Sequence, residues 1–291
     1  MTLRIRQLAY GVGAEIIDLD LTRRLSDEMI AEIRAAWSKY GVLVLRGQDI
    51  TLEQHIAFSA RFGPLDDHAN LFKYRHPECP EIFVVSTKPN ADGSPSDTRE
   101  VGNGWHSDAS YTLYPNMGSL LLGIEVPEYG GDTMFSNTYM AYDTLSETFK
   151  TMIDPLWAVH SLAHAFRESG KKRDPAATAA MLAANPAVMH PLVRVHPDNG
   201  RKTIYASPLN TSHIAGLSMG ESRAILDYLH LHAARPEFTY RHRWQRHDLV
   251  MWDNRCTMHS TLFDRVPGTI RHMHRTTIRG ERSGKLYEEE Q

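Results

Sequence analysis

Two residues with metal-binding side chains stand close together in this sequence, and a third stands half a chain away. His106 and Asp108 lie two positions apart in Trp105-His106-Ser107-Asp108, and in an extended backbone such residues point to the same side. Such a pair arises readily by chance, so its meaning depends on a third ligand. His259 is the candidate, and only a folded core that joins distant segments can bring it to the other two.

The donor set leaves two metals open. Two imidazoles and one carboxylate on one face of an octahedral ion leave three positions free, which suits non-haem Fe(II) and oxygen chemistry. The same three residues also suit a zinc ion that is completed by one water. The choice depends on what else the chain supplies near the metal.

Two arginines follow the third histidine. If residues 271–278 form a strand, Arg271 and Arg275 face the same side, with Met273 between them. A guanidinium matches a carboxylate through two parallel hydrogen bonds, so two of them on an inner face indicate a small anionic ligand. A single arginine of this kind is more often an exposed strand residue. Two of them beside a candidate metal ligand favour the site interpretation.

Composition excludes several classes of protein. The 291 residues are 42% hydrophobic and 23% charged, as in ordinary globular proteins, and the net charge is −3. No basic block suits nucleic acid or an anionic membrane, and no apolar run has transmembrane length. Two cysteines, Cys79 and Cys256, are too few for a disulfide framework, and no signal-peptide pattern is present. We therefore expect a cytoplasmic protein with no nucleic-acid or membrane partner.

Hydrophobic periodicity predicts strands and helices in a mixed order. Helices are expected in the ranges 26–41, 51–63, 139–152 and 218–235, with Ser26 and Thr51 as the caps of the first two. Strands are expected within 3–21 and at 42–45, 82–85, 119–126, 191–195, 202–205, 238–244, 249–252 and 273–278, with a hairpin turn at 197–200. This order predicts an α+β chain with a β core, a sandwich or barrel, rather than a doubly wound sheet. We expect one catalytic domain over residues 1–291, with a flexible active-site loop at about 66–104 and an insert at about 164–186.

Four motifs in this order carry a family resemblance: Trp105-His106-Ser107-Asp108, Gly130-Gly131-Asp132-Thr133, Trp252-Asp253-Asn254-Arg255 with His259, and Arg271-x3-Arg275-x-Thr277. Together they resemble the TauD/TfdA family of Fe(II)- and 2-oxoglutarate-dependent dioxygenases, from about Leu8 to Gly280. The resemblance implies a double-stranded β-helix, or jelly-roll, with flanking helices. It also implies that His106, Asp108 and His259 are the catalytic iron ligands.

The same resemblance implies the co-substrate site and the reaction. Thr133 and Arg271 would hold the distal carboxylate of 2-oxoglutarate, and Arg275 would lie deeper, near its other end or near a substrate anion. The cofactors would be Fe(II), 2-oxoglutarate and O2. The implied oxidoreductase hydroxylates a small organic anion while 2-oxoglutarate becomes succinate and CO2. Asp108 favours hydroxylation, because related halogenases lack this carboxylate.

Two substrate classes compete within the family. His68 matches a sulfonate-contacting histidine of taurine dioxygenases, but Leu71 and Gly102 replace the aromatic residue and the asparagine expected there. The segments 238–244, 248–256 and 212–217 resemble the aryloxyalkanoate (2,4-D-type) dioxygenases nearly residue for residue. We favour an aryloxyalkanoate carboxylate that meets Arg275, with His68 or His213 assisting; the alternative is taurine or another alkylsulfonate.

Two other classes of protein stay open. A zinc hydrolase could use the same three ligands, but it would need neither Thr133 nor Arg271 and would work without oxygen. A non-catalytic binding protein on the same fold would be expected to have lost a ligand or the co-substrate arginine, and this chain keeps them. The family contains dimers and tetramers, so we also expect a homo-oligomer.

Overall fold

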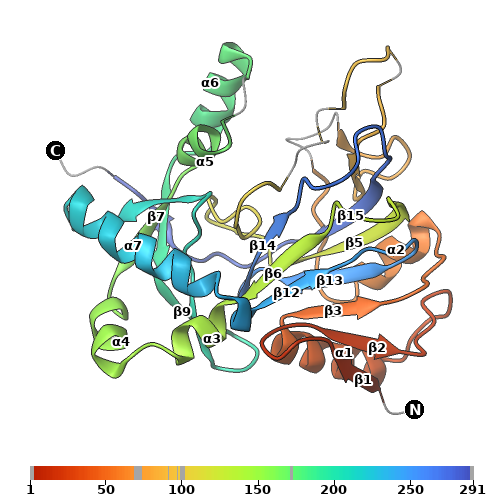
Figure 1. Ribbon diagram of the computed structural model, residues 1–291, viewed down its shortest axis with the longest axis horizontal. Helices are drawn as coiled ribbons and strands as arrows, with labels where there is room; N and C mark the ends of the chain where they lie inside the picture. Colours follow the sequence, from red (N-terminus) through yellow and green to blue (C-terminus); the bar gives the residue numbers. More distant parts are fainter. Residues whose placement is uncertain are drawn as a thin grey trace.

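Seven strands form the largest sheet, and their order in space differs from their order along the chain (Figure 1). The computed structural model describes residues 3–68, 74–90, 92–96, 98, 102–170 and 173–288. From edge to edge the sheet runs β1 (Arg4–Gln7), β2 (Ala14–Ile17), β3 (Val42–Leu45), β13 (Leu249–Asp253), β5 (Gly118–Glu125), β15 (His272–Ile278) and β4 (Phe83–Ser86). Only the β2–β3 pair is parallel among these neighbours.

The central strands are buried on both faces, so their side chains divide between two cores. On β13, Leu249 and Met251 join a cluster that contains Ile33 and Trp37 of helix α1 (Asp27–Tyr40). Helix α2 (Leu52–Ser59) covers the same face. Val250 and Trp252 alternate to the opposite face and join a second cluster. This explains why the strand is continuously apolar in sequence.

The first two helices begin where the sequence predicts them. Ser26 caps α1 by accepting a hydrogen bond from the backbone N–H of Met29. Thr51 and Gln54 form a reciprocal capping box at α2. Gly41 ends α1 with a φ of 71°, a left-handed conformation that costs glycine little.

A three-stranded sheet packs against the second core and has the order β12 (Thr239–His242), β6 (Thr133–Asn137) and β14 (Thr257–Thr261). Phe135 of β6 belongs to the same cluster as Val250 and Trp252 of β13, so the two sheets share that core. The sequence pattern did not predict β14, although Thr257 and Thr261 are β-branched residues suited to a strand.

The predicted helix 139–152 was wrong, because the chain forms two helices there, α3 (Thr138–Asp143) and α4 (Glu147–Ile153). Ser146 accepts a hydrogen bond from the backbone N–H of Phe149 and caps α4. A side-chain cap inside the range therefore interrupts what hydrophobic spacing alone reads as one helix.

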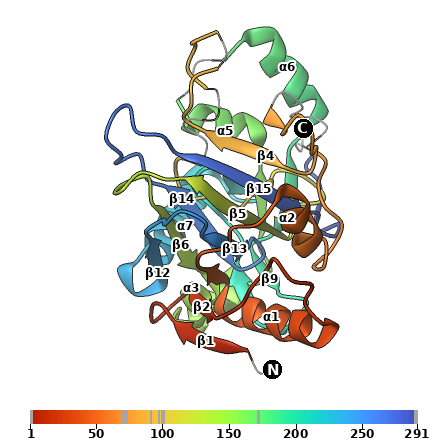
Figure 2. The same ribbon diagram turned by 90° about the vertical axis from the view of Figure 1, so that its right-hand side faces the viewer.

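The remaining elements lie on the side of the molecule opposite helices α1 and α2 (Figure 1), which face the viewer in Figure 2. They are the sheet β11 (Thr211–Ile214), β7 (Trp157–His160), β8 (Val188–Pro191) and β16 (Lys285–Leu286), the hairpin β9 (Val193–Val195) and β10 (Lys202–Ile204), the helices α5 (Leu162–Glu168), α6 (Pro175–Ala184) and α7 (Met219–Ala233), and the short 3-10 helix Pro236–Phe238. The hairpin and α7 match their predictions. Helix α6 projects from the body and buries none of its residues (Figure 1).

Three further expectations concern the segments around this framework. The range 66–104 contains the edge strand β4, while Leu71, which weighed against taurine, lies outside the described residues. Cys79 and Cys256 are free thiols. Within the described ranges, every helix is too short or too polar to cross a bilayer.

Candidate active site

Backbone pairing joins the two histidines that the sequence separates by half its length. The N–H of His106 donates to the carbonyl oxygen of His259 at 3.0 Å, and the N–H of His259 donates back to His106 at 2.8 Å. This isolated antiparallel bridge brings the two rings to a centroid distance of 4.1 Å. The Nε2 atoms of both histidines lie 3.9 Å from Oδ1 of Asp108. The structure therefore brings all three predicted ligands together, with their ligand atoms within 4.8 Å of one another.

The protonation states at this cluster suit a divalent cation. Burial, with His106 nearby, lowers the pKa of His259 to about 3, so its imidazole is neutral near pH 7. Burial alone would raise the pKa of the Asp108 carboxyl, but the Arg275 guanidinium and the site histidines hold it well below its usual range. Neutral imidazoles and a charged carboxylate are the states that bind metals. The donor atoms of His106, Asp108 and His259 lie within 4.8 Å of one another, and two histidines with one aspartate fit an iron ion.

Arg275 reaches the cluster from β15. Its Nη1 lies 3.3 Å from Oδ1 of Asp108, and its guanidinium carbon lies 4.9 Å from the ring centroid of Phe83 on β4. Its Nε atom is buried and has no hydrogen-bond partner among the described residues. A bound anion would satisfy this donor.

Arg271 lies one residue before β15 and contacts a different part of the site. A register irregularity between His272 and Met273 separates it from Arg275 along the strand. Nε of Arg271 donates to the carbonyl oxygen of Gly131 at 3.0 Å, whereas its Nη2 is buried without a partner among the described residues. Burial lowers the pKa of Arg271 to about 10, so it stays cationic near pH 7. The bulge changes the direction of the strand, so Arg271 contacts Gly131 while Arg275 contacts Asp108.

Thr133 is tied to Arg271 through the indole of Trp244. The indole Nε1 donates to the Thr133 hydroxyl at 3.1 Å, and the guanidinium carbon of Arg271 lies 5.7 Å from a Trp244 ring centroid. Thr133 and Arg271 are 2% and 4% exposed. They therefore offer a hydroxyl and a guanidinium in one dry environment, as a carboxylate site requires.

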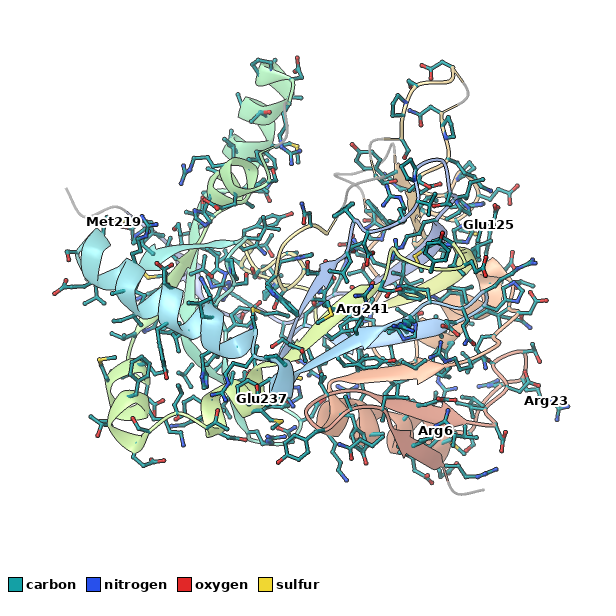
Figure 3. The ribbon with its side chains drawn as sticks, in the orientation of Figure 1. Arg6, Arg23, Glu125, Met219, Glu237 and Arg241 are labelled. Atoms are coloured by element: carbon teal, nitrogen blue, oxygen red, sulfur yellow. The ribbon has the colours of Figure 1, made fainter. Side chains whose placement is uncertain are left out.

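The glycine turn before Thr133 has little spare space. A Cβ on Gly131 (φ 67°) would lie 3.2 Å from Cδ of Arg271, so the missing side chain makes room for the arginine. The neighbouring Arg241, labelled in Figure 3, donates to Asp132 at 2.7 Å and to Asp264 at 2.6 Å. Asp264 also accepts from the N–H of Gly131. These contacts fix the turn from outside.

His68 lies beside Arg275 and Phe83. Its ring centroid is 5.4 Å from that of Phe83, and burial, with Arg275 nearby, lowers its pKa to about 4. The side chain is buried, and Nε2 has no hydrogen-bond partner among the described residues. Its φ of 51° is unusual for a residue other than glycine. Ala109, directly after Asp108, has a φ of 52°, so both strained positions border one site.

His213 lies elsewhere. Its Nε2 is 3.1 Å from the Tyr287 hydroxyl, and its Nδ1 is 3.0 Å from the Ser212 hydroxyl. It lines a surface groove of about 600 Å³ together with His164 and Arg167, and the lining of this groove includes none of the three candidate ligands. The structure brings His68 to the arginines and gives His213 a different setting. The substrate role of His213 stays a prediction.

Four residues around Asp108 had no assigned role in the sequence. Ser119 and Asn254 hydrogen-bond to Asp108, Phe83 lies against Arg275, and burial with Asp108 nearby raises the pKa of Tyr111. Ser119 carries a recognisable signal, because it is a buried polar residue directly before three consecutive leucines of β5.

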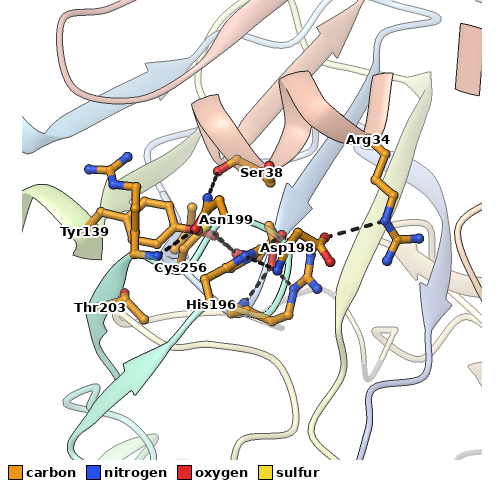
Figure 4. Close-up of polar contacts among 12 residues, drawn as sticks. Arg34, Ser38, Tyr139, His196, Asp198, Asn199, Thr203 and Cys256 are labelled. Atoms are coloured by element: carbon orange, nitrogen blue, oxygen red, sulfur yellow. Dashed lines mark hydrogen bonds and ion pairs between the residues drawn. The ribbon is translucent and has the colours of Figure 1, made fainter. Parts of the chain in front are cut away.

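A second group of potential ligands does not have metal-site chemistry. His196, Asp253 and Cys256 also place ligand atoms within 4.8 Å of one another. Figure 4 labels His196 and Cys256 of this group. However, both carboxylate oxygens of Asp253 accept hydrogen bonds from Arg255, at 2.9 and 2.6 Å. Burial also raises the pKa of the Cys256 thiol, which keeps it protonated. This group is an internal ion-pair network.

Comparison with known proteins identifies relatives whose names describe oxygenases that depend on alpha-ketoglutarate. The sequence model described as "Taurine catabolism dioxygenase TauD, TfdA family" matches residues 4–277. The chain is 37% identical over 262 residues to the alpha-ketoglutarate-dependent 2,4-dichlorophenoxyacetate dioxygenase of Cupriavidus pinatubonensis, covering 86% of this chain and 88% of that protein. It is 31% identical over 291 residues to the alpha-ketoglutarate-dependent sulfonate dioxygenase of Saccharomyces cerevisiae, covering 96% and 68%.

A solved structure extends the similarity to three dimensions. The crystal structure of AAD-2 in complex with Mn(II) and N-oxalylglycine superposes with a TM-score of 0.86 at 35% sequence identity. The match covers 97% of this chain and 99% of that one.

Proposed function

This chain belongs to the TauD/TfdA family and is an Fe(II)- and 2-oxoglutarate-dependent dioxygenase, and we propose that it hydroxylates an aryloxyalkanoate carboxylate. One observation carries the proposal: beside Asp108, Arg275 offers a largely buried cation, Phe83 an aromatic face, and His68 a ring nitrogen without a partner among the described residues. A small acid with an aromatic body matches this combination.

We assign the metal to His106, Asp108 and His259, whose donor atoms converge. Fe(II), with 2-oxoglutarate and O2, supplies the oxidising chemistry in which the 2-oxo acid becomes succinate and CO2 and a substrate C–H becomes C–OH. In the proposed site, Arg271 and Thr133 hold the distal carboxylate of the co-substrate. Nη2 of Arg271 has no acceptor in the described part of the chain, which supports this role, since a buried guanidinium N–H without an acceptor is costly.

Arg275 would meet the substrate anion or the near end of the co-substrate. His68, neutral near pH 7, can then offer an N–H to the anion without carrying charge itself. Phe83 supports the guanidinium from one side. The substrate contact of His213 rests on the family resemblance alone. The hydrogen-bond partners of its ring are Ser212 and Tyr287.

Alkylsulfonates are the second candidate class. The anion-binding residues do not by themselves distinguish a sulfonate from a carboxylate, and a sulfonate dioxygenase is among the relatives. The aromatic surroundings of the anion site and the identity to a 2,4-dichlorophenoxyacetate dioxygenase favour the aryloxyalkanoate.

For the fold, we propose that the sheets around the shared core form a double-stranded β-helix. The supporting feature is the pairing of β13, β5 and β15 in one sheet against β12, β6 and β14 in the other. β14 contributes His259, and the backbone of His106 attaches to it. A jelly-roll would give this arrangement, with the metal ligands at one end.

The experiment is a substrate screen that follows succinate with Fe(II), 2-oxoglutarate and O2. Phenoxyacetate, 2-phenoxyethanol and an alkylsulfonate form the test set. Hydroxylation beside the ether oxygen makes a hemiacetal that releases phenol, whereas hydroxylation beside a sulfonate releases sulfite. We expect phenol from phenoxyacetate and little turnover of the uncharged alcohol. Sulfite release without phenol release would contradict the substrate proposal.

The metal assignment has its own test. His106→Ala and Asp108→Ala should abolish turnover while thermal unfolding stays cooperative. Retained activity in either variant would show that the replaced residue is not a required metal ligand. Turnover without oxygen would instead indicate a zinc hydrolase.

A further inference from the structure

The two carboxylate oxygens of Asp108 have different surroundings. Oδ1 faces Nε2 of His106 and of His259, each at 3.9 Å, and Nη1 of Arg275 at 3.3 Å. Oδ2 accepts a hydrogen bond from the Ser119 hydroxyl at 2.8 Å, and the side-chain amide nitrogen of Asn254 lies 3.5 Å from it. One oxygen is therefore turned toward the candidate metal position, and the other is held by neutral donors.

The orientation of the Asn254 amide is decided by its neighbours. Its carbonyl oxygen accepts from the backbone N–H of Asp108 at 3.1 Å and from the indole Nε1 of Trp252 at 3.2 Å. Two N–H donors on one side of the amide require the oxygen there, so the NH2 group must face Asp108 Oδ2. Asn254 thus holds the Asp108 backbone and its carboxylate together.

Asn254 is itself fixed by the charged residues on either side of it. Arg255 donates to both carboxylate oxygens of Asp253, and Nε2 of His196 lies 3.1 Å from Oδ2 of Asp253. Asp253 and His196 are fully buried, with 0% and 1% of their surface exposed. These contacts anchor the turn between β13 and β14 from which Asn254 reaches Asp108.

The same network continues outward to Asp198 and to the partly exposed Arg34, both labelled in Figure 4. Arg255 also donates to Asp198 at 2.9 Å, and Arg34 of helix α1 lies 3.5 Å from Asp198. The outer end of the network can be altered without touching Asn254, which provides a control.

We propose that Ser119 and Asn254 are positioning residues that hold Oδ2 of Asp108, so that the carboxylate binds the metal through Oδ1 alone. This inference rests on the proposed function. A 2-oxo acid and dioxygen would together need the three positions that two histidines and one carboxylate oxygen leave open. A carboxylate bound through both oxygens would occupy one of them. Outer hydrogen bonds of this kind orient metal ligands generally.

The variants remove the contacts one at a time. Ser119→Ala deletes one buried hydroxyl. Asn254→Asp keeps an oxygen for Trp252 and the Asp108 N–H but replaces the NH2 donor with a second oxygen. Arg34→Ala is the matched control, because it loosens the network at its exposed end and leaves both contacts to Asp108 intact.

Three measurements distinguish an effect on the orientation of Asp108 from a general loss of stability. They are anaerobic Co(II) titration followed by absorption, the ratio of hydroxylated product to succinate, and thermal unfolding. We expect Ser119→Ala and Asn254→Asp to change the Co(II) spectrum and to lower metal affinity or turnover on the order of 10-fold. We also expect more succinate per product. Arg34→Ala should lower only the unfolding temperature. If Asn254→Asp does not fold, Ser119→Ala decides alone, since it removes one oxygen atom.

Wild-type spectra, affinity and product ratio in folded Ser119→Ala would overturn the inference. Failure of the proposed function looks different, since the wild-type protein would then bind no Co(II) or make no succinate. The Co(II) titration needs no knowledge of the organic substrate.

Discussion

Replacing Arg271 by alanine should weaken 2-oxoglutarate selectively. Arg271 is 4% exposed and keeps its charge near pH 7, and no described residue accepts a hydrogen bond from its Nη2. Losing one partner of a buried, hydrogen-bonded charge pair costs about 2–5 kcal/mol. At about 1.4 kcal/mol per factor of ten, the affinity for 2-oxoglutarate should fall roughly 30-fold to a few thousand-fold.

The co-substrate itself offers the second half of a double-mutant cycle. 2-Oxovalerate has the same chain length as 2-oxoglutarate but ends in a methyl group instead of the distal carboxylate. The wild-type protein should therefore bind 2-oxovalerate about as weakly as Arg271→Ala binds 2-oxoglutarate. The variant should bind both acids about equally, because the contact is already lost.

The assay is calorimetric titration of the metal-loaded protein without oxygen, followed by KM values for the co-substrate and the organic substrate. Arg275→Ala is the matched control, and it should not discriminate between the two oxo acids in this way. The assignment of Arg271 is refuted if Arg271→Ala weakens both acids by the same factor. It is equally refuted if the KM of the organic substrate rises as much as that of 2-oxoglutarate.

Three further predictions concern stability. Arg255→Ala should lower the free energy of unfolding by about 3–5 kcal/mol, because it leaves the Asp253 carboxylate buried without its cation. Arg223→Ala, which breaks an exposed ion pair, should lower it by less than about 1 kcal/mol. Equal urea midpoints of the two variants would contradict this. Burial lowers the pKa of His55 to about 3 and that of His274 to about 4, so the unfolded chain binds more protons between these values and 6.5. The contribution of these two neutral histidines to the free energy of unfolding is complete above pH 6.5. On acidification it should fall by about 1.4 kcal/mol per pH unit for each histidine. In urea titrations at several pH values, His274→Asn should reduce the dependence of the free energy of unfolding on pH. Mn(II) at about 100 times its Kd should stabilise the folded protein by about 2.7 kcal/mol, and an unchanged unfolding temperature after metal addition would argue against a preformed site.

Local sequence signals predicted most of the framework. Alternation and continuous apolar runs located β3, β5 and β13, and side-chain caps located the starts of α1 and α2. The predicted break at Gly41 also holds. The failures have local causes too, since the cap at Ser146 divides one predicted helix, and β14 is short and mixed in character.

The candidate site was predictable as a set of residue types but not as an arrangement. His106 and Asp108 are neighbours in sequence, so their shared direction follows from extended backbone geometry. The approach of His259 depends on a backbone bridge between distant segments, which no local pattern encodes. The settings of His68 and His213 also differ, although the resemblance implies a substrate contact for each.

The sequence by itself determined the chemistry of this protein, because ligand type and motif order limit which metal and co-substrate the residues suit. Only the tertiary structure decided how that chemistry is oriented. Oδ2 of Asp108 meets Ser119 and Asn254, which reach it from one strand and one turn far apart in the chain, so Oδ1 is the oxygen that faces the two histidines. The separation of Arg271 from Arg275 depends on a bulge in β15. Hydrogen-bond direction and strand register arise from packing between distant segments, so they appear only once the chain is folded.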